Sequence, residues 1–375
     1  MNKLFYLVPA VLVVLLSYAF ISHGISNQDR LNYGSEDVFD VADLGSVKDS
    51  PVELGQVKWI RDFDKGTKEA KAQNKPLLVL FQEVPGCSTA SGYGKNVLSH
   101  PLIVEAIETL FVPVAIYNNH SGEDERVLKS FNEPSWNNPV VRIMTPDREE
   151  LVSRLSGNYT KAGLVNAMIS ALKNDNKPVP QYLVLLQKEL TAKSGKSEKA
   201  VFAMHCFWIG EGVLANVNGV ISTEPGFMGG REVVELAYNP DVVSYNELLT
   251  AARSNNVASH VYAVNSDQEK VAKQVSGKSS VSQLGAFSPD RQPKYYMSGT
   301  LYRFVPMTNT QIARVNAAIG SMQSPDIFLS PRQLEIYKYV RANQNKDWVN
   351  IVRTPNIETA WAQTVSQMGS KLSKR

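Results

Sequence analysis

The stretch Val201-Phe-Ala-Met-His-Cys-Phe-Trp208 decides the fold of the C-terminal half of this chain. Its first four residues are apolar and predict a strand, and the apolar residues 207–217 predict a helix. Cys206 therefore stands where a strand runs into a helix. A thiol in that place lies at the positive end of the helix, which favours the thiolate and makes the sulfur a stronger nucleophile at neutral pH.

The segments that follow Cys206 extend this domain. Apolar runs predict strands at 220–227, 232–238 and 261–264, and helical patterns occupy 244–253 and 267–275. We expect a mixed α+β domain over residues 200–345. The residues from 346 to 375 are more polar and are interpreted as a C-terminal tail, with a frayed end at 371–375.

A separate domain is predicted over residues 57–175. Strands are expected at 76–81, 111–117 and 139–144, with a short one at 150–155. Helices are expected at 59–74, 94–110 and 160–173, so strands and helices alternate as in a layered α/β fold. A polar stretch with two prolines, 174–180, ends this domain. Residues 176–199 are then a linker with a helix at 181–191.

The N-terminal segment carries an apolar run at 4–21 behind Lys3. A bilayer takes about 20 apolar residues to span, so this run fits a cleaved signal peptide or a retained membrane anchor over residues 1–25. Both interpretations stay open. In either case the body is exported to an oxidising periplasmic or cell-surface space, behind a tether at 26–56.

Composition excludes several classes of function. Lys and Arg total 39 against 36 Asp and Glu, and a net charge of +3 gives no reason to expect a nucleic-acid partner. The five His residues are scattered without the spacing of metal ligands, so no metal site is predicted. Nothing in the sequence implies a cofactor. The two Cys residues, Cys87 and Cys206, permit one disulfide.

Four segments around Cys206, in this order and spacing, resemble the A-type peptide methionine sulfoxide reductases. They are Val201-Phe-Ala-Met-His-Cys-Phe-Trp208, 219–230 with its Gly-Phe-Met-Gly-Gly end, 232–240 with Glu-Val-Val at its start, and 243–249. The resemblance implies the α+β fold of that family. It also implies methionine sulfoxide as substrate and an external thiol as reductant.

The resemblance also assigns roles to four residues. Cys206 would attack the sulfoxide sulfur, Phe207 and Trp208 would hold the substrate methyl group, and Glu232 would protonate the sulfoxide oxygen. The residue types agree, because aromatic rings offer an apolar wall to a thioether-like group, and burial raises the pKa of a carboxyl so that it can deliver a proton. The alternative is that Cys206, Phe207 and Trp208 are ordinary core residues.

The sequence departs from that family in two ways. A tyrosine that helps to bind the sulfoxide oxygen has no counterpart, because Gly229-Gly230 runs almost directly into Glu232. Tyr295, Tyr296 and Tyr302 are candidates for its role, although their segments otherwise fit strand core. The family's resolving cysteines are missing as well.

Cys87 lies in Glu83-Val-Pro-Gly-Cys87, just after the first predicted strand, which resembles thioredoxin-like proteins with cysteine or selenocysteine after Val-Pro-Gly. Pro139 resembles the proline that packs against the thiol in that fold, and we expect its peptide bond to be cis. Ala90 stands where a thioredoxin has its second cysteine. Cys87 therefore works with a thiol outside its own domain, or the domain is a redox-inert scaffold.

The functional hypothesis joins the two cysteines. Cys206 reduces methionine sulfoxide, free or in exported proteins, and its sulfenic acid condenses with Cys87 to a disulfide that an external thiol reopens. One alternative is a thiol-disulfide oxidoreductase that uses Cys87 on a degenerate reductase scaffold. Another is an envelope binding module that grips Met-containing segments without turnover.

Overall fold

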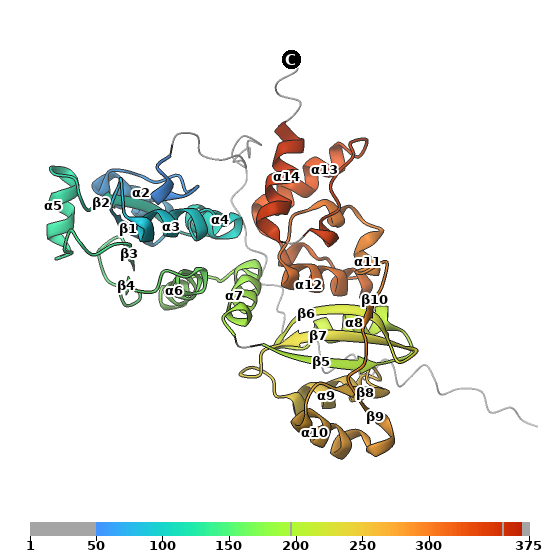
Figure 1. Cartoon of the computed structure of the whole chain (residues 1–375). Coiled ribbons are helices and arrows are strands. Elements are labelled where there is room, and N and C mark those ends of the chain that lie inside the picture. Colours follow the sequence, from blue (N-terminus) through green and yellow to red (C-terminus); the bar gives the residue numbers. More distant parts are fainter. Residues whose placement is uncertain (1–49, 196, 355, 370–375) are drawn as a thin grey trace, which may run out of the picture. The chain divides into compact units, whose positions relative to one another are not determined.

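A computed structural model describes residues 50–195, 197–354 and 356–369 (Figure 1). The predicted signal or anchor lies outside these residues, as do most of the predicted tether and the expected frayed end. No helix within the described ranges is long and apolar enough to cross a membrane.

The N-terminal domain is built on a four-stranded sheet in the order β2-β1-β3-β4. Strand β1 pairs in parallel with β2 and antiparallel with β3. The strands are β1 Leu77–Gln82, β2 Val112–Tyr117, β3 Val140–Met144 and β4 Leu155–Ser156. All six residues of β1 are buried, which is expected of a strand covered by helices on both faces.

Helices cover both faces of this sheet. They are α2 Phe63–Gln73, α3 Ser88–Asn96, α4 Pro101–Leu110, α5 Glu123–Ser130 and α6 Lys161–Asn174. Successive side chains of β1 enter two different cores, with Leu78 and Leu80 in one and Leu77 and Val79 in the other. The predicted α/β layering is confirmed.

Three local predictions in this domain were wrong. The helix expected at 94–110 is two helices, α3 and α4, because Pro101 begins a new helix and α3 starts directly after Cys87. The strand expected at 150–155 is reduced to the two residues of β4. The end of the predicted tether is packed, since Val52–Leu54 form a 3₁₀ helix and Leu54 is buried in the first core.

Helix α7 (Gln181–Lys193) occupies the predicted linker. Its Tyr182, Leu183 and Leu186 belong to the core of the N-terminal domain. At its other end, Glu189 Oε2 accepts the backbone N–H of Thr310 at 3.0 Å, near the start of α12 (Asn309–Gly320). The linker is therefore a packed helix.

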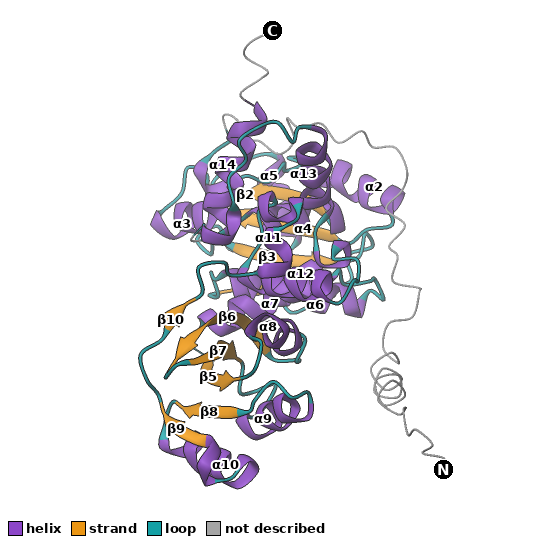
Figure 2. Ribbon diagram, turned by 90° about the vertical axis from the view of Figure 1, so that its right-hand side faces the viewer, coloured by secondary structure: helices purple, strands orange, loops and turns teal. Residues whose placement is uncertain are grey.

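The C-terminal domain has a six-stranded mixed sheet in the order β10-β6-β7-β5-β8-β9. Only β8 and β9 pair in parallel. The strands are β5 Glu198–Ala203, β6 Val220–Met228, β7 Arg231–Tyr238, β8 His260–Ala263, β9 Val281–Gln283 and β10 Ser288–Pro289. Helices α8 Phe207–Ala215, α9 Tyr245–Ser254 and α10 Ser266–Ser276 accompany this sheet. Figure 2 shows these strands in orange and the helices in purple. The α+β prediction is confirmed.

Helices dominate the chain after β10. They are α11 Tyr295–Ser298, the 3₁₀ helix Leu301–Phe304, α12, α13 Pro331–Ala342 and α14 Ile357–Gly369. The tyrosine segments expected as strands are thus helical. The expected polar tail instead contains α14, which buries Ile357, Ala360 and Trp361 at helical spacing.

Candidate active site

Cys206 is the N-cap residue of α8 and follows β5 after a two-residue connection. Its carbonyl accepts the N–H of Gly210 at 3.0 Å, so the helix begins at the thiol residue itself. Cys206 is half-buried and its thiol is free. The free amide groups at a helix start favour negative charge on a nearby sulfur.

Glu232 reaches the same helix start from β7. Strands β5 and β7 pair with Ala203 opposite Val233, and the Glu232 carbonyl accepts the N–H of Met204 at 3.1 Å. The Glu232 side chain then lies at the first amide of α8, where Oε2 accepts the N–H of Phe207 at 2.9 Å. A carboxyl group is therefore anchored to the residue next to the thiol.

Four aromatic rings line this site, contributed by α8, β6 and α11. The buried Phe207 ring has its centroid 5.5 Å from that of Trp208 and 5.3 Å from that of Phe227. Trp208 stacks on Tyr295 at 3.9 Å with the planes 10° apart, and its Nε1 donates to Asp290 Oδ2 at 3.1 Å. The rings form a broad apolar wall beside the thiol.

The sequence analysis gave Phe227 no role, although the hairpin between β6 and β7 places it. Gly229 and Gly230 make the turn with φ of 56° and 74°, a backbone conformation that glycine adopts without strain. The strand register that follows puts Phe227 opposite Glu232. The signal was the two-glycine turn, which fixes the register of both strands.

Among the three candidate tyrosines, Tyr296 lies close to the thiol. Burial raises the pKa of Tyr296, and the negative charge of a Cys206 thiolate raises this pKa further. Its ring packs on Gly320, where an added Cβ would come within 2.6 Å of the ring. Tyr302 belongs elsewhere, since its hydroxyl donates to Asp326 Oδ1 at 2.7 Å and its ring stacks on Tyr337.

Cys87 is the N-cap residue of α3 and is exposed, with a free thiol. Two carboxylates surround the start of this helix. Glu53 Oε1 accepts the N–H of Gly86 at 2.9 Å, and Glu83 Oε2 accepts the N–H of Cys87 at 3.3 Å. Ala90, at the position of the usual second cysteine, is fully buried.

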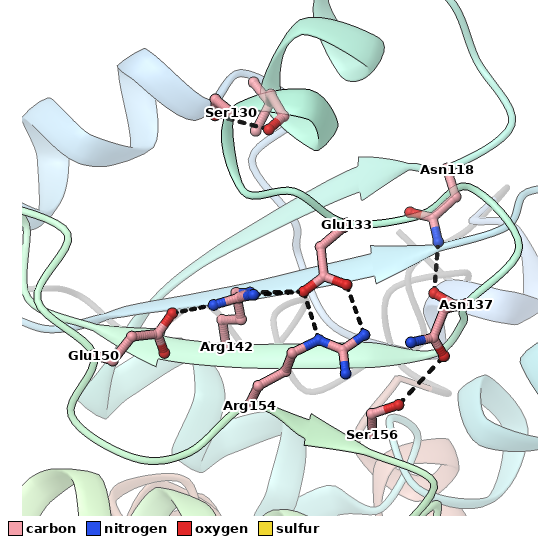
Figure 3. A network of polar contacts seen from close by, with 9 residues as sticks. Asn118, Ser130, Glu133, Asn137, Arg142, Glu150, Arg154 and Ser156 are labelled. Atoms are coloured by element: carbon pink, nitrogen blue, oxygen red, sulfur yellow. Dashed lines mark hydrogen bonds and ion pairs between the residues drawn. The ribbon is translucent and has the colours of Figure 1, made fainter.

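Pro139 has the expected cis peptide bond, and the peptide bond between Val84 and Pro85 is cis as well. Figure 3 shows the polar network that holds the loop before Pro139. The carbonyl of Asn137 accepts Asn118 Nδ2 at 3.1 Å, and Asn137 Oδ1 accepts the Ser156 hydroxyl at 3.3 Å. The loop is tied to β4 and to the end of β2.

Glu133 is the buried centre of this network (Figure 3). Its Oε1 accepts Arg142 Nε at 2.8 Å and Arg154 Nε at 2.6 Å, and its Oε2 accepts Arg154 Nη2 at 2.7 Å. Burial tends to raise the pKa of Glu133, but the hydrogen bonds from Arg154 and Arg142 outweigh it and hold this pKa below its usual range. Glu133 therefore stays ionised.

The structure brings Cys206, Phe207, Trp208 and Glu232 together in one site and places Cys87 and Pro139 in the other domain. No disulfide joins the two cysteines. Within the described residues, no three His, Cys, Asp or Glu side chains gather into a group that would hold a metal ion.

Residues 58–146 match the family model described as thioredoxin-like. This part of the chain is a thioredoxin-like domain. The solved structure of a DsbH oxidoreductase aligns at 15% sequence identity with a TM-score of 0.28, over 37% of this chain and 95% of its own length.

A short segment is similar to the peptide methionine sulfoxide reductase MsrA. The protein of Methanococcus maripaludis strain C6 is 40% identical over 77 residues, which cover 16% of this chain and 49% of the relative. MsrA of Methanothermobacter thermautotrophicus is 41% identical over 69 residues, 14% of this chain and 41% of the relative. MsrA 1 of Nostoc sp. strain PCC 7120 is 33% identical over 81 residues, 17% of this chain and 50% of the relative.

The chain spans about half the length of the curated relatives that it matches. The likeness to MsrA is thus partial, and it accompanies a thioredoxin-like domain. Together they indicate a redox function for this protein.

Proposed function

We propose that this protein reduces methionine sulfoxide with Cys206 as its nucleophile. The observation that carries the proposal is the hydrogen bond from the Phe207 N–H to Glu232 Oε2, because it fixes a carboxyl group beside a free thiol. The aromatic wall of Phe207, Trp208, Phe227 and Tyr295 suits the methyl group of the substrate.

The chemistry follows from these groups. The Cys206 sulfur attacks the sulfoxide sulfur while Glu232 delivers a proton to the sulfoxide oxygen, and the Tyr296 hydroxyl donates a hydrogen bond to the same oxygen. The oxygen then passes to Cys206, and methionine leaves as the thioether. One sulfoxide and one thiol give one thioether and one sulfenic acid, so the atoms and electrons balance.

The second step uses Cys87. The Cys206 sulfenic acid condenses with the Cys87 thiol to form a disulfide and water, and a dithiol reductant reduces this disulfide to two thiols. Two observations support this step. The chain has two cysteines in all, so Cys87 is the other thiol that it offers, and Cys87 is free and exposed.

A second candidate function is thiol-disulfide exchange by Cys87 alone. The exposed thiol at the start of α3 in a thioredoxin-like domain favours it. The carboxylates of Glu53 and Glu83 weigh against it, since they already accept the amides that would stabilise a thiolate. A third candidate, binding of Met-containing segments without turnover, draws on the aromatic wall alone. We also propose an extracytoplasmic location, on the strength of the apolar run at 4–21 alone.

Steady-state assays with both epimers of methionine sulfoxide and a dithiol reductant test the proposal. We expect turnover of one epimer, loss of all turnover in Cys206→Ser, and release of only the first equivalent of methionine in Cys87→Ser when the reductant is a protein dithiol. Cys87→Ser is the matched control, because it removes the other thiol. Undiminished turnover in Cys206→Ser would rule out the proposed nucleophile, and binding without released methionine would favour the binding module.

A further inference from the structure

We propose that Glu211 and Lys294 are positioning residues that hold Tyr295 and Tyr296 beside Cys206. The inference rests on the proposed function, because it concerns the same site. Glu211 belongs to α8, the helix that the thiol begins, and Lys294 directly precedes α11, the helix that carries both tyrosines. An ion pair joins the two side chains.

The ion pair lies in the interior of the domain. Glu211 is fully buried, and the Lys294 side chain is 10% exposed. The Glu211 carboxylate accepts Thr223 Oγ1 and Asn316 Nδ2, each at 3.1 Å, while Lys294 Nζ also donates to the Thr223 carbonyl. A buried charge is tolerated when its hydrogen bonds are satisfied, and both carboxylate oxygens here have partners.

The cluster fixes α11 at two points. Lys294 is the N-cap residue, with a left-handed φ of 60° that a lysine adopts only at an energetic cost. Two residues beyond the tyrosine pair begins, Met297 donates its N–H to Asn316 Oδ1 at 3.0 Å, and Asn316 donates to Glu211 in turn. Tyr295 and Tyr296 lie between these two points, so both ties to α8 run through Glu211.

Two contacts at the active site depend on this arrangement. Tyr295 stacks on Trp208, which is in the first turn of α8, and Tyr296 lies near Cys206. The helix α11 has only four residues, which is too short to hold its own place without tertiary contacts. Breaking the ion pair should therefore move both tyrosines away from the thiol and its aromatic neighbours.

A double-mutant cycle tests this inference. In the full chain, Lys294→Met should lower kcat for methionine sulfoxide about tenfold or more, as Tyr296→Phe does. In the Tyr296→Phe background, Lys294→Met should lower kcat less than about twofold, because the hydroxyl that it positions is already gone. Equal losses of kcat in both backgrounds, or no loss in either, would overturn the inference.

Two further variants protect this test. Glu211→Gln/Lys294→Met removes the charge from both partners, so it avoids an unpaired buried carboxylate if the single variant does not fold. It should show the same coupling with Tyr296→Phe. Glu189→Gln is the control, since Glu189 is also a buried carboxylate that joins two helices but lies outside the site. It should show no coupling with Tyr296→Phe.

A spectroscopic readout separates this inference from the proposed function. The near-ultraviolet circular dichroism of Trp208, taken as the difference between each protein and its Trp208→Phe derivative, reports the stack with Tyr295. We expect this signal to change in Lys294→Met even if the wild-type chain proves to have no reductase activity. An unchanged Trp208 signal would contradict the positioning role, whereas inactive wild type would contradict the function alone.

Discussion

Glu232 and Cys206 meet because of strand pairing, although they are 26 positions apart in the sequence. The sequence pointed to both residues, but it did not show how the carboxyl reaches the thiol helix. The structure supplies the link, since β7 pairs with β5 and the carboxylate accepts the first amide after Cys206. Its role as the acid stays a prediction.

We expect Glu232→Gln to lower kcat by a factor of about 10² to 10⁴, the usual contribution of a general acid. The glutamine Oε1 can still accept the Phe207 N–H, so the local fold should persist while the transferable proton is lost. Steady-state kinetics with the reactive epimer measure the change. A kcat within about twofold of the wild-type value would exclude Glu232 as the proton donor.

At the scale of elements, apolar patterns predicted the strands of both sheets well. They did so because buried strands are short, continuous apolar runs bounded by polar turns. The same reasoning failed for α11 and for α14. Four residues of α11 contain too little periodicity to show a helix, and the buried face of α14 is hidden among polar residues.

These failures matter for the site. Tyr296 approaches Cys206 through the packing of α11 on α8 and α12, and tertiary contacts of this kind leave no local pattern in the sequence. The sequence could therefore name three candidate tyrosines, but it could not choose among them. The structure separates them, since Tyr302 is hydrogen-bonded to Asp326 instead.

The network around Glu133 gives a prediction about stability. Glu133→Gln should lower the free energy of unfolding by about 1 to 3 kcal/mol at pH 7, because an amide N–H would then face a guanidinium N–H. Glu150→Gln is the matched control, since Glu150 contacts the same Arg142 but is 37% exposed. We expect the control to change stability by less than about 1 kcal/mol.

The pH dependence of this difference follows from the depressed pKa of Glu133. The ionised carboxylate stabilises the folded state fully above its unfolded pKa of about 4.3, and this stabilisation is lost as the pH falls through the folded pKa. Denaturant titrations of wild type and Glu133→Gln should therefore converge in acid. A gap that persists unchanged well below pH 4 would contradict the ionic role.

At the scale of the whole molecule, two thiols of different domains take part in the proposed cycle. The length of 375 residues predicted two domains, and two separate sheets are observed. Neither thiol is sealed in a core, because Cys87 is exposed and Cys206 is half-buried. A disulfide requires the sulfur atoms to come within about 2 Å, so the cycle includes a step in which the two domains bring their thiols together.

The most direct measurement is a single turnover of the Cys87→Ser chain, in which the proposed sulfenic acid has no partner thiol. The reduced protein is mixed with one equivalent of methionine sulfoxide and with dimedone, and the products are identified by mass spectrometry. We predict one equivalent of methionine and a dimedone adduct on the peptide that contains Cys206. No released methionine, or methionine released while Cys206 stays unmodified, would contradict the proposed function.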